Sequence, residues 1–190
     1  MNIVFDGDSI SCGVGASPTM TLSSQTGRLL RNKSTIHVVA QGGRQLSECL
    51  DTFNQHVAAL YDSGTDRNIV FLKAGDNDIT RGISADTTYN RLEGYVTLAH
   101  GCGWKVIVAS NLQRFDVSDD AQRELSVFND LTIKNKAKAD LIVDFASDQI
   151  LGRLESRINR HYYNEDGVHP TDVGYTILAQ KVASAIDQIL

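Results

Sequence analysis

Cysteine and proline are both scarce in this chain of 190 residues, which contains three cysteines and two prolines. The cysteines lie far apart and form no Cys-x-x-Cys pair: Cys12, Cys49 and Cys102. This pattern suggests neither a disulfide framework nor a zinc site, so we expect three small core or helix residues in a reducing compartment. No repeat, linker or low-complexity tract interrupts the chain, which indicates a single domain over residues 1–190.

The chain also lacks a basic excess and a long apolar run. Lys and Arg number 18 against 23 Asp and Glu, a formal net charge of -5, and the basic residues are not clustered. We therefore expect no nucleic-acid partner, because phosphate binding needs a concentrated basic surface. No apolar run reaches membrane-spanning length, and a strand-like run begins where a signal peptide would lie. We expect a cytoplasmic protein that binds no membrane, with export by another route left open.

What the chain does contain is a series of short runs rich in β-branched and aromatic residues. They lack strict polar alternation and are bounded by Gly, Asp or Asn, which is typical of buried strands. The runs cover residues 2–5, 35–40, 68–74, 104–110 and 140–145. Between them, apolar residues recur at helical spacing. These helices are predicted around residues 22–30, 46–60, 92–99, 121–131 and 178–189. The alternation predicts an α/β fold with right-handed crossovers and a parallel sheet covered on both faces.

Polar clusters follow each predicted strand. In order along the chain they are Asp6–Ser9, Gly42–Gly43, Gly75–Asp78, Asn111, and the pair Asp166 and His169. Ligands of open parallel sheets bind outside the carboxyl ends of the strands. All the candidate functional residues are therefore predicted to gather at one edge of the sheet.

These clusters contain the groups that acyl transfer requires. A serine hydroxyl such as that of Ser9 becomes a nucleophile when an imidazole takes its proton, and His169 is the candidate base. Asp166, three residues earlier in DGVHP, is placed to orient that imidazole. The backbone N–H groups of Ser9 and Gly43 and the side-chain amide of Asn77 are candidate donors to an oxyanion.

Four sequence blocks carry these residues in order: GDS at 7–9, AQGGRQL at 40–46, AGDNDI at 74–79 and DGVHP at 166–170. Together they resemble the blocks of the GDSL or SGNH hydrolase superfamily, over nearly the whole chain. The resemblance implies a three-layer α/β/α sandwich with a flavodoxin-like five-stranded parallel sheet. It also implies a serine esterase with a Ser9–His169–Asp166 triad, an oxyanion hole of Ser9, Gly43 and Asn77, and no metal or organic cofactor.

Two positions depart from the family pattern. The family usually has an asparagine shortly before the glycine of the second block, whereas this chain reads Gln41-Gly42-Gly43, so the choice between Gly42 and Gly43 as the donor stays open. The third block carries Asp76 at its variable position, next to the expected oxyanion hole. Its carboxylate either disfavours anionic substrates or points to solvent.

The stretch DGDS also suits a magnesium-dependent phosphatase with an aspartate nucleophile. In such an enzyme Asp6 attacks phosphate, Asp8 acts as acid and base, and Ser110 belongs to the second motif. The acidic pair needed for magnesium would have to follow Ser110, but the compact pair Asp76 and Asp78 precedes it. In the esterase interpretation, Asp6, Asp8 and Asp78 are instead structural hydrogen-bonding residues that hold the turns.

Three more classes of protein have less support from the residues. A nucleophile-elbow hydrolase needs a glycine two residues after the serine, where this chain has Ser11. A metal hydrolase would use His161, Asp166 and His169. A non-catalytic glycan-binding module would have no need of a complete triad.

The substrate is expected to be a small-molecule or carbohydrate ester. The compact chain leaves little room for a lipase-type lid, which favours short acyl groups, and deacetylation of a sugar is the first choice. The family resemblance also allows lysophospholipase or thioesterase activity. Arg44, Arg81 and Arg114 fall in strand-end loops and are candidate contacts for a polar or anionic leaving group. The sequence does not specify the oligomeric state.

Overall fold

Five strands form one parallel sheet at the centre of the molecule. The computed structural model describes residues 1–114, 116–134 and 137–189. The strands are β1 (Asn2–Gly7), β2 (Thr35–Val38), β3 (Asn68–Lys73), β4 (Lys105–Ala109) and β5 (Leu141–Val143). Their order across the sheet is β2-β1-β3-β4-β5, and every pairing is parallel. The predicted α/β fold with a flavodoxin-like sheet is confirmed.

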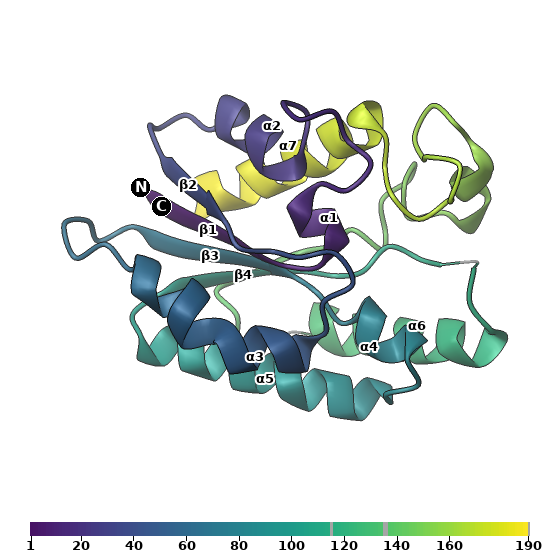
Figure 1. The fold of residues 1–190 in the computed structure, drawn as a ribbon, viewed down its shortest axis with the longest axis horizontal. Helices are drawn as coiled ribbons and strands as arrows, with labels where there is room; N and C mark the ends of the chain where they lie inside the picture. Colours follow the sequence, from purple (N-terminus) through teal and green to yellow (C-terminus); the bar gives the residue numbers. More distant parts are fainter. Residues whose placement is uncertain (115, 135–136, 190) are drawn as a thin grey trace.

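Helices cover both faces of this sheet, as Figure 1 shows. One layer contains α2 (Leu22–Leu29) and α7 (Asp172–Gln188), and the other contains α3 (Leu46–His56), α5 (Ala85–Gly101) and α6 (Asp119–Ile133). The five helices predicted from apolar spacing are all present, with bounds that differ by several residues.

Two apolar cores result, one on each face of the sheet. Successive strand side chains point to opposite faces. In β1, Ile3 and Phe5 pack in the core beneath α2 and α7, whereas Val4 packs in the core beneath α3, α5 and α6. The central strands are buried on both faces, which explains why their sequences are continuously apolar rather than alternating.

Two short helices that apolar spacing did not predict lie at the ends of strands. They are α1 (Ser9–Cys12) after β1 and α4 (Asp76–Thr80) after β3. Two 3-10 turns, η1 (Ala58–Leu60) and η2 (Leu154–Ile158), complete the described elements. Each short helix begins in a polar cluster that the sequence places after a strand.

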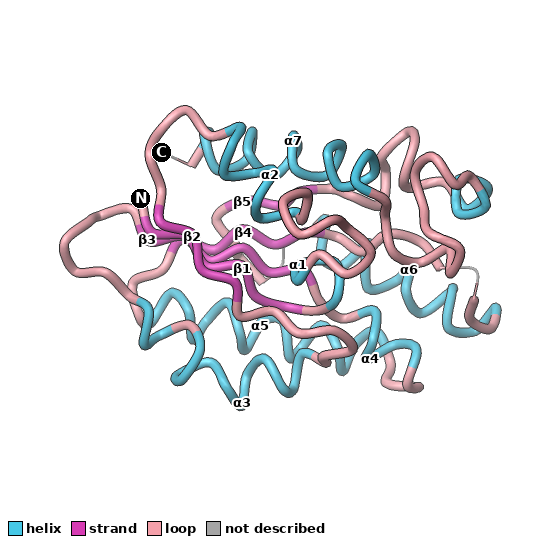
Figure 2. The backbone as a smooth tube through the Cα atoms, turned by 45° about the horizontal axis from the view of Figure 1, so that its top comes forward, coloured by secondary structure: helices cyan, strands magenta, loops and turns pink. Residues whose placement is uncertain are grey.

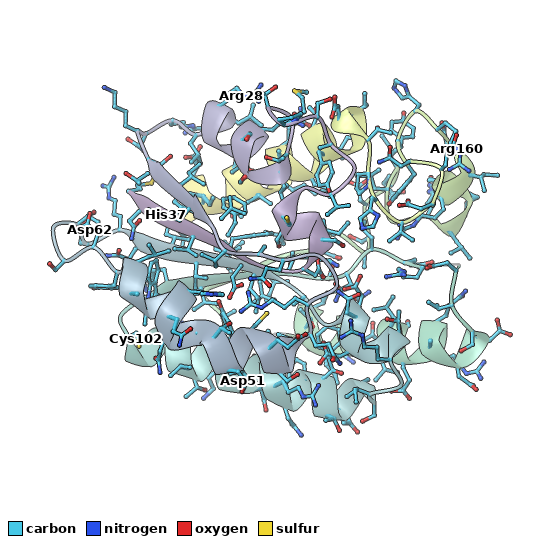
Figure 3. All side chains as sticks on the ribbon, in the orientation of Figure 1. Arg28, His37, Asp51, Asp62, Cys102 and Arg160 are labelled. Atoms are coloured by element: carbon cyan, nitrogen blue, oxygen red, sulfur yellow. The ribbon has the colours of Figure 1, made fainter. Side chains whose placement is uncertain are left out.

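The chain termini lie at one end of the molecule, and the loops that follow the carboxyl ends of the strands lie at the other (Figures 1 and 2). Arg160, labelled in Figure 3, belongs to the long loop between β5 and α7 at this second end. Within the described part of the chain, no helix has the length and apolar character needed to cross a membrane.

Candidate active site

Ser9 lies at the sharp turn between β1 and α1. Gly7 ends the strand with φ of 120°, and a Cβ there would lie only 1.9 Å from the carbonyl oxygen of Lys73, so the position requires glycine. Asp8 caps the helix, since its Oδ1 accepts a hydrogen bond from Ile10 N at 2.9 Å. The turn therefore presents Ser9 as the first residue of α1, at the carboxyl end of β1.

His169 and Asp166 are hydrogen-bonded to each other within one turn. His169 Nδ1 lies 2.7 Å from Asp166 Oδ2, and Asp166 Oδ1 accepts hydrogen bonds from the backbone N–H groups of Val168 at 2.8 Å and His169 at 3.0 Å. Gly167, with φ of 62°, allows the chain to turn between them. Because Nδ1 is bound to the carboxylate, Nε2 is the nitrogen available to take a proton.

The hydrogen bonds also act on the charge of Asp166. Partial burial raises the pKa of this carboxyl, but hydrogen bonds from the His169 side chain and from two backbone N–H groups outweigh that effect. The resulting pKa lies below its ordinary value, so Asp166 is ionised at neutral pH. An ionised carboxylate stabilises a protonated imidazole beside it.

Arg157 supports the loop that carries this pair, and sequence reasoning missed it. Its guanidinium is buried, and Nη1 donates to the carbonyl oxygens of Gly167 at 3.2 Å and Val168 at 3.1 Å. The same guanidinium lies 4.3 Å from the centre of the Tyr163 ring. A lone arginine in an irregular segment carries no sequence signal that distinguishes it from a surface residue.

Gly43 lies in the turn between β2 and α3, and Asn77 is the second residue of α4, which follows β3. Gly43 has φ of 76°, a conformation that favours glycine, and its carbonyl accepts a hydrogen bond from Arg81 Nη2 at 3.0 Å. Asn77 Nδ2 donates one hydrogen bond to the carbonyl of Arg44 at 3.1 Å. A side-chain amide has two N–H groups, so the second one is left for a ligand.

A cavity of about 370 Å³ unites the candidate residues. It is lined by Ser9, Gly42, Gly43, Asn77, Asp166 and His169, together with Val14, Val168 and Arg114. We call this cavity the Ser9 pocket. The structure thus brings together every residue of the predicted triad and oxyanion hole, and both glycines of the second block border it. Of the two, only Gly43 has a positive φ, so its backbone conformation favours glycine, whereas that of Gly42 does not.

A buried group of three charged side chains lies beside the turns that carry Ser9 and Asn77. Lys73 Nζ lies 2.8 Å from Asp8 Oδ2 and 3.0 Å from Asp76 Oδ2. Burial and the neighbouring Asp76 carboxylate raise the pKa of Asp8. Burial also raises the pKa of Asp76, but Lys73, Asp8 and Arg114 outweigh it and lower the pKa below its ordinary range. The expectation that Asp76 points to solvent is wrong, because its carboxylate is buried and pairs with Lys73. The alternative, that this carboxylate disfavours anionic substrates, stays a prediction.

Asp6 is wholly buried and fully hydrogen-bonded. Its Oδ1 accepts from Arg44 Nη1 at 2.6 Å and from Gly7 N at 2.7 Å, and its Oδ2 accepts from Tyr95 Oη at 2.7 Å. The expectation that Arg44 contacts a leaving group is wrong, because its side chain is only 4% exposed and is paired with Asp6. A carboxylate with these partners has no access to a phosphate ester.

Asp78 holds the turn after β3, as expected of a structural residue. Its Oδ2 accepts from Leu46 N at 2.9 Å and its Oδ1 from Arg91 Nη1 at 2.6 Å. This pair of bonds ties α4 to the start of α3 and to α5. The two remaining candidate arginines differ: Arg81 bonds to the Gly43 carbonyl, whereas Arg114 lines the Ser9 pocket.

Comparison with known families identifies the chain. A model of the GDSL-like Lipase/Acylhydrolase family matches residues 5–177. The protein therefore belongs to this family, as the four sequence blocks indicate. Comparison with curated proteins gives no match.

Solved structures show the same fold. A member of the lipolytic G-D-S-L family from Veillonella parvula has a TM-score of 0.80 at 23% identity, covering 99% of each chain. A GDSL-like lipase from Bacteroides thetaiotaomicron has a TM-score of 0.76 at 23% identity, covering 100% of this chain and 89% of that lipase. An acetyl xylan esterase has a TM-score of 0.71 at 16% identity, covering 97% of this chain and 98% of that esterase.

Proposed function

We propose that this protein is a serine esterase that hydrolyses short-chain acyl esters, with O-acetylated carbohydrates as its substrates. The observation that carries the proposal is the Ser9 pocket, where a serine, a histidine bound to a carboxylate and two candidate oxyanion donors meet. Membership of the GDSL-like family supports ester hydrolysis in general.

In the proposed mechanism, His169 Nε2 takes the proton of the Ser9 hydroxyl while Ser9 Oγ attacks the ester carbonyl. Asp166 orients the imidazole and stabilises its protonated form. The N–H groups of Ser9 and Gly43 and the Asn77 amide donate to the oxyanion of the tetrahedral intermediate. His169 then protonates the leaving alcohol, and a water molecule activated by the same imidazole releases the acid from the acyl-enzyme.

The proposed preference for short acyl groups follows from the size of the pocket. A cavity of about 370 Å³ is near the lower end of small-molecule sites, roughly 300–1,000 Å³, and has to hold both sides of the ester bond. The fold shared with an acetyl xylan esterase supports acetyl esters as the first substrates to test. A long-chain thioester or lysophospholipid is the second candidate substrate, and an acyl-length series separates the two.

The first prediction is that Ser9→Ala lowers kcat for methyl acetate by at least about a thousandfold, because the attacking oxygen is gone. The measurement is release of acid at constant pH with purified protein. Ser11→Ala is the matched control, because Ser11 lies in the same short helix with its Oγ bonded to the Lys73 carbonyl. We expect that variant to keep most of the activity.

Three results would contradict the proposal. Full activity in Ser9→Ala would remove Ser9 from the mechanism. Activity that is lost in EDTA and restored by magnesium would favour the aspartate phosphatase, whereas we expect turnover to be unchanged by EDTA. A folded wild-type protein without activity on any ester would indicate the non-catalytic binding module.

A further inference from the structure

A second cavity lies next to the Ser9 pocket, on the other side of Arg114. It has a volume of about 590 Å³ and is bordered by α6, by the loop after β4 and by the loop after β5. We call it the α6 cavity. Arg114 lines both cavities, and both lie at the carboxyl edge of the sheet. Because Arg114 borders both, the two cavities are neighbours.

The side chain of Arg114, which borders both cavities, is held in place by ion pairs. Its Nε and Nη2 donate to the two carboxylate oxygens of Asp116 at 2.8 and 2.6 Å. Its Nη1 lies 3.6 Å from Asp76 Oδ2, and the side chain is 14% exposed. Because the guanidinium forms a bidentate pair with Asp116, its charge is compensated, and Arg114 offers no free positive charge to an anionic substrate.

The lining of the α6 cavity is rich in polar side chains, beside the apolar residues Leu125, Ile133 and Ala146. It contains the amides of Gln113 and Gln122 and the hydroxyls of Ser126 and Ser147. The lining also contains the charged side chains of Arg114, Arg123, Asp119 and Asp130. Arg114 pairs with Asp116 and Arg123 with Asp120, so the lining has no excess of positive charge. Such a lining both donates and accepts hydrogen bonds, as a group with many hydroxyls requires.

Two other chemical classes fit the lining less well. An alkyl chain would remove water from the charged and amide groups without replacing their hydrogen bonds, which is costly. An anionic group would meet the carboxylates of Asp119 and Asp130 as well as the arginines. The volume lies in the range of small-molecule sites, roughly 300–1,000 Å³.

We propose that the α6 cavity is a subsite for the alcohol portion of the ester, and that it takes an uncharged, hydroxyl-rich group such as a sugar ring. The proposal rests on the proposed esterase function and adds where the leaving group binds. The acetyl group and the reacting bond stay in the Ser9 pocket, and the alcohol that His169 protonates leaves from the α6 cavity.

The test fills the cavity from two sides. In Ser126→Trp the new side chain enters the cavity from α6, and in Ser147→Trp it enters from the loop after β5. Val127→Trp is the matched control, because Val127 is the next residue of α6, is 48% exposed and is outside the cavity lining. Each variant is assayed on methyl acetate and on methyl 6-O-acetylglucoside, which share the acetyl group and differ in the alcohol.

We expect both cavity variants to raise KM for the sugar ester by about tenfold while kcat changes little, since the lost contacts are made in the ground state and transition state alike. Activity on methyl acetate should stay within about twofold of the wild type, because a methyl group does not reach the cavity. Val127→Trp should leave both substrates unaffected.

Three outcomes would overturn the subsite. The first is a sugar-ester KM that is equal in the cavity variants and in Val127→Trp. The second is an equal loss on methyl acetate. The third is a greater loss on hexyl acetate than on the sugar ester, which would assign the cavity to an alkyl chain. Failure of the proposed function looks different, because the wild type would then hydrolyse neither acetate ester.

Discussion

At the scale of single residues, Asp6 shows how a charge close to the site serves the fold. The side chain is completely buried, and its two oxygens accept hydrogen bonds from Arg44, Gly7 and Tyr95. Two of these partners come from distant parts of the chain: Arg44 precedes α3, and Tyr95 is in α5. Asp6 therefore connects the end of β1 to the helical layer beneath it, below the turn that carries Ser9.

We predict that Asp6→Asn destabilises the protein more than it affects catalysis. Removing one member of a buried ion pair leaves the other charge without compensation, which costs about 3–5 kcal/mol. The free energy of unfolding, measured in urea, should fall by about this amount. The kcat of the folded fraction should stay within about tenfold of the wild type.

Tyr95→Phe is the control for this variant, because it removes one hydrogen bond to Asp6 and leaves the Asp6–Arg44 pair intact. We expect it to cost about 1–2 kcal/mol. An Asp6→Asn protein with unchanged stability and no activity would instead place Asp6 in the chemistry.

The residues of the site differ in how far the sequence predicts them. Ser9, Asn77, Asp166 and His169 stand in short local blocks, so their grouping at one sheet edge follows from the strand pattern alone. The burial of Lys73 cannot be predicted from the sequence, because a single lysine at the end of an apolar strand usually extends into solvent. Its burial depends on Asp8 and Asp76, which only the folded sheet brings together.

At the scale of elements, the sequence pattern does not predict the two short helices, because they too depend on contacts that form only in the folded chain. Helix α1 has four residues and α4 has five, too few for apolar spacing to indicate a helix. Their starts depend on a single side chain or a single dihedral angle: Asp8 caps α1, and Gly75 precedes α4 with φ of 108°. Helices α3, α5, α6 and α7 each bury two or more apolar residues, and that pattern is visible in the sequence. Helix α2 buries Leu22 together with the polar residues Ser23, Gln25 and Thr26, so its sequence signal is weaker.

Lys73 joins these two short helices to their strands. It ends β3, and its ammonium group contacts both Asp8 before α1 and Asp76 at the start of α4. The turns that carry Ser9 and Asn77 are therefore fixed to each other by one buried cation. We expect their relative position to depend on that cation.

We predict that Lys73→Met destabilises the protein in a pH-dependent manner. Without the cation, burial and mutual repulsion raise the pKa values of Asp8 and Asp76 in the folded state above their unfolded values. Folding then takes up protons, so the loss of stability is larger at pH 8 and smaller at pH 5. The expected loss at pH 8 is about 3–5 kcal/mol.

The measurement is urea unfolding of Lys73→Met and wild type at both pH values. Lys105→Met is the control, because Lys105 pairs with Asp140 at the protein surface, where its side chain is 57% exposed. That variant should lose little stability at either pH. An equal deficit for Lys73→Met at pH 5 and pH 8 would contradict the role of Lys73 as the partner of the two carboxylates.

At the scale of the whole molecule, the two apolar cores share the strands of one sheet. Strands β1, β3 and β4 each supply residues to both cores, for example Val70 and Phe71 of β3 on opposite faces. The loss of either helical layer would expose one whole face of these strands to water. Because the exposed apolar surface would be large, partly unfolded states with a single layer should be scarcely populated.

We therefore predict that the chain unfolds as a single domain. The only tryptophan of the sequence, Trp104, is buried in the core beneath α3, α5 and α6, so its fluorescence reports on that core alone. Far-UV circular dichroism reports on the helices of both layers. The two signals should give the same urea midpoint and the same m value in the wild type. A circular dichroism transition that separates into two steps, with Trp104 following only one of them, would show that the α2 and α7 layer unfolds independently.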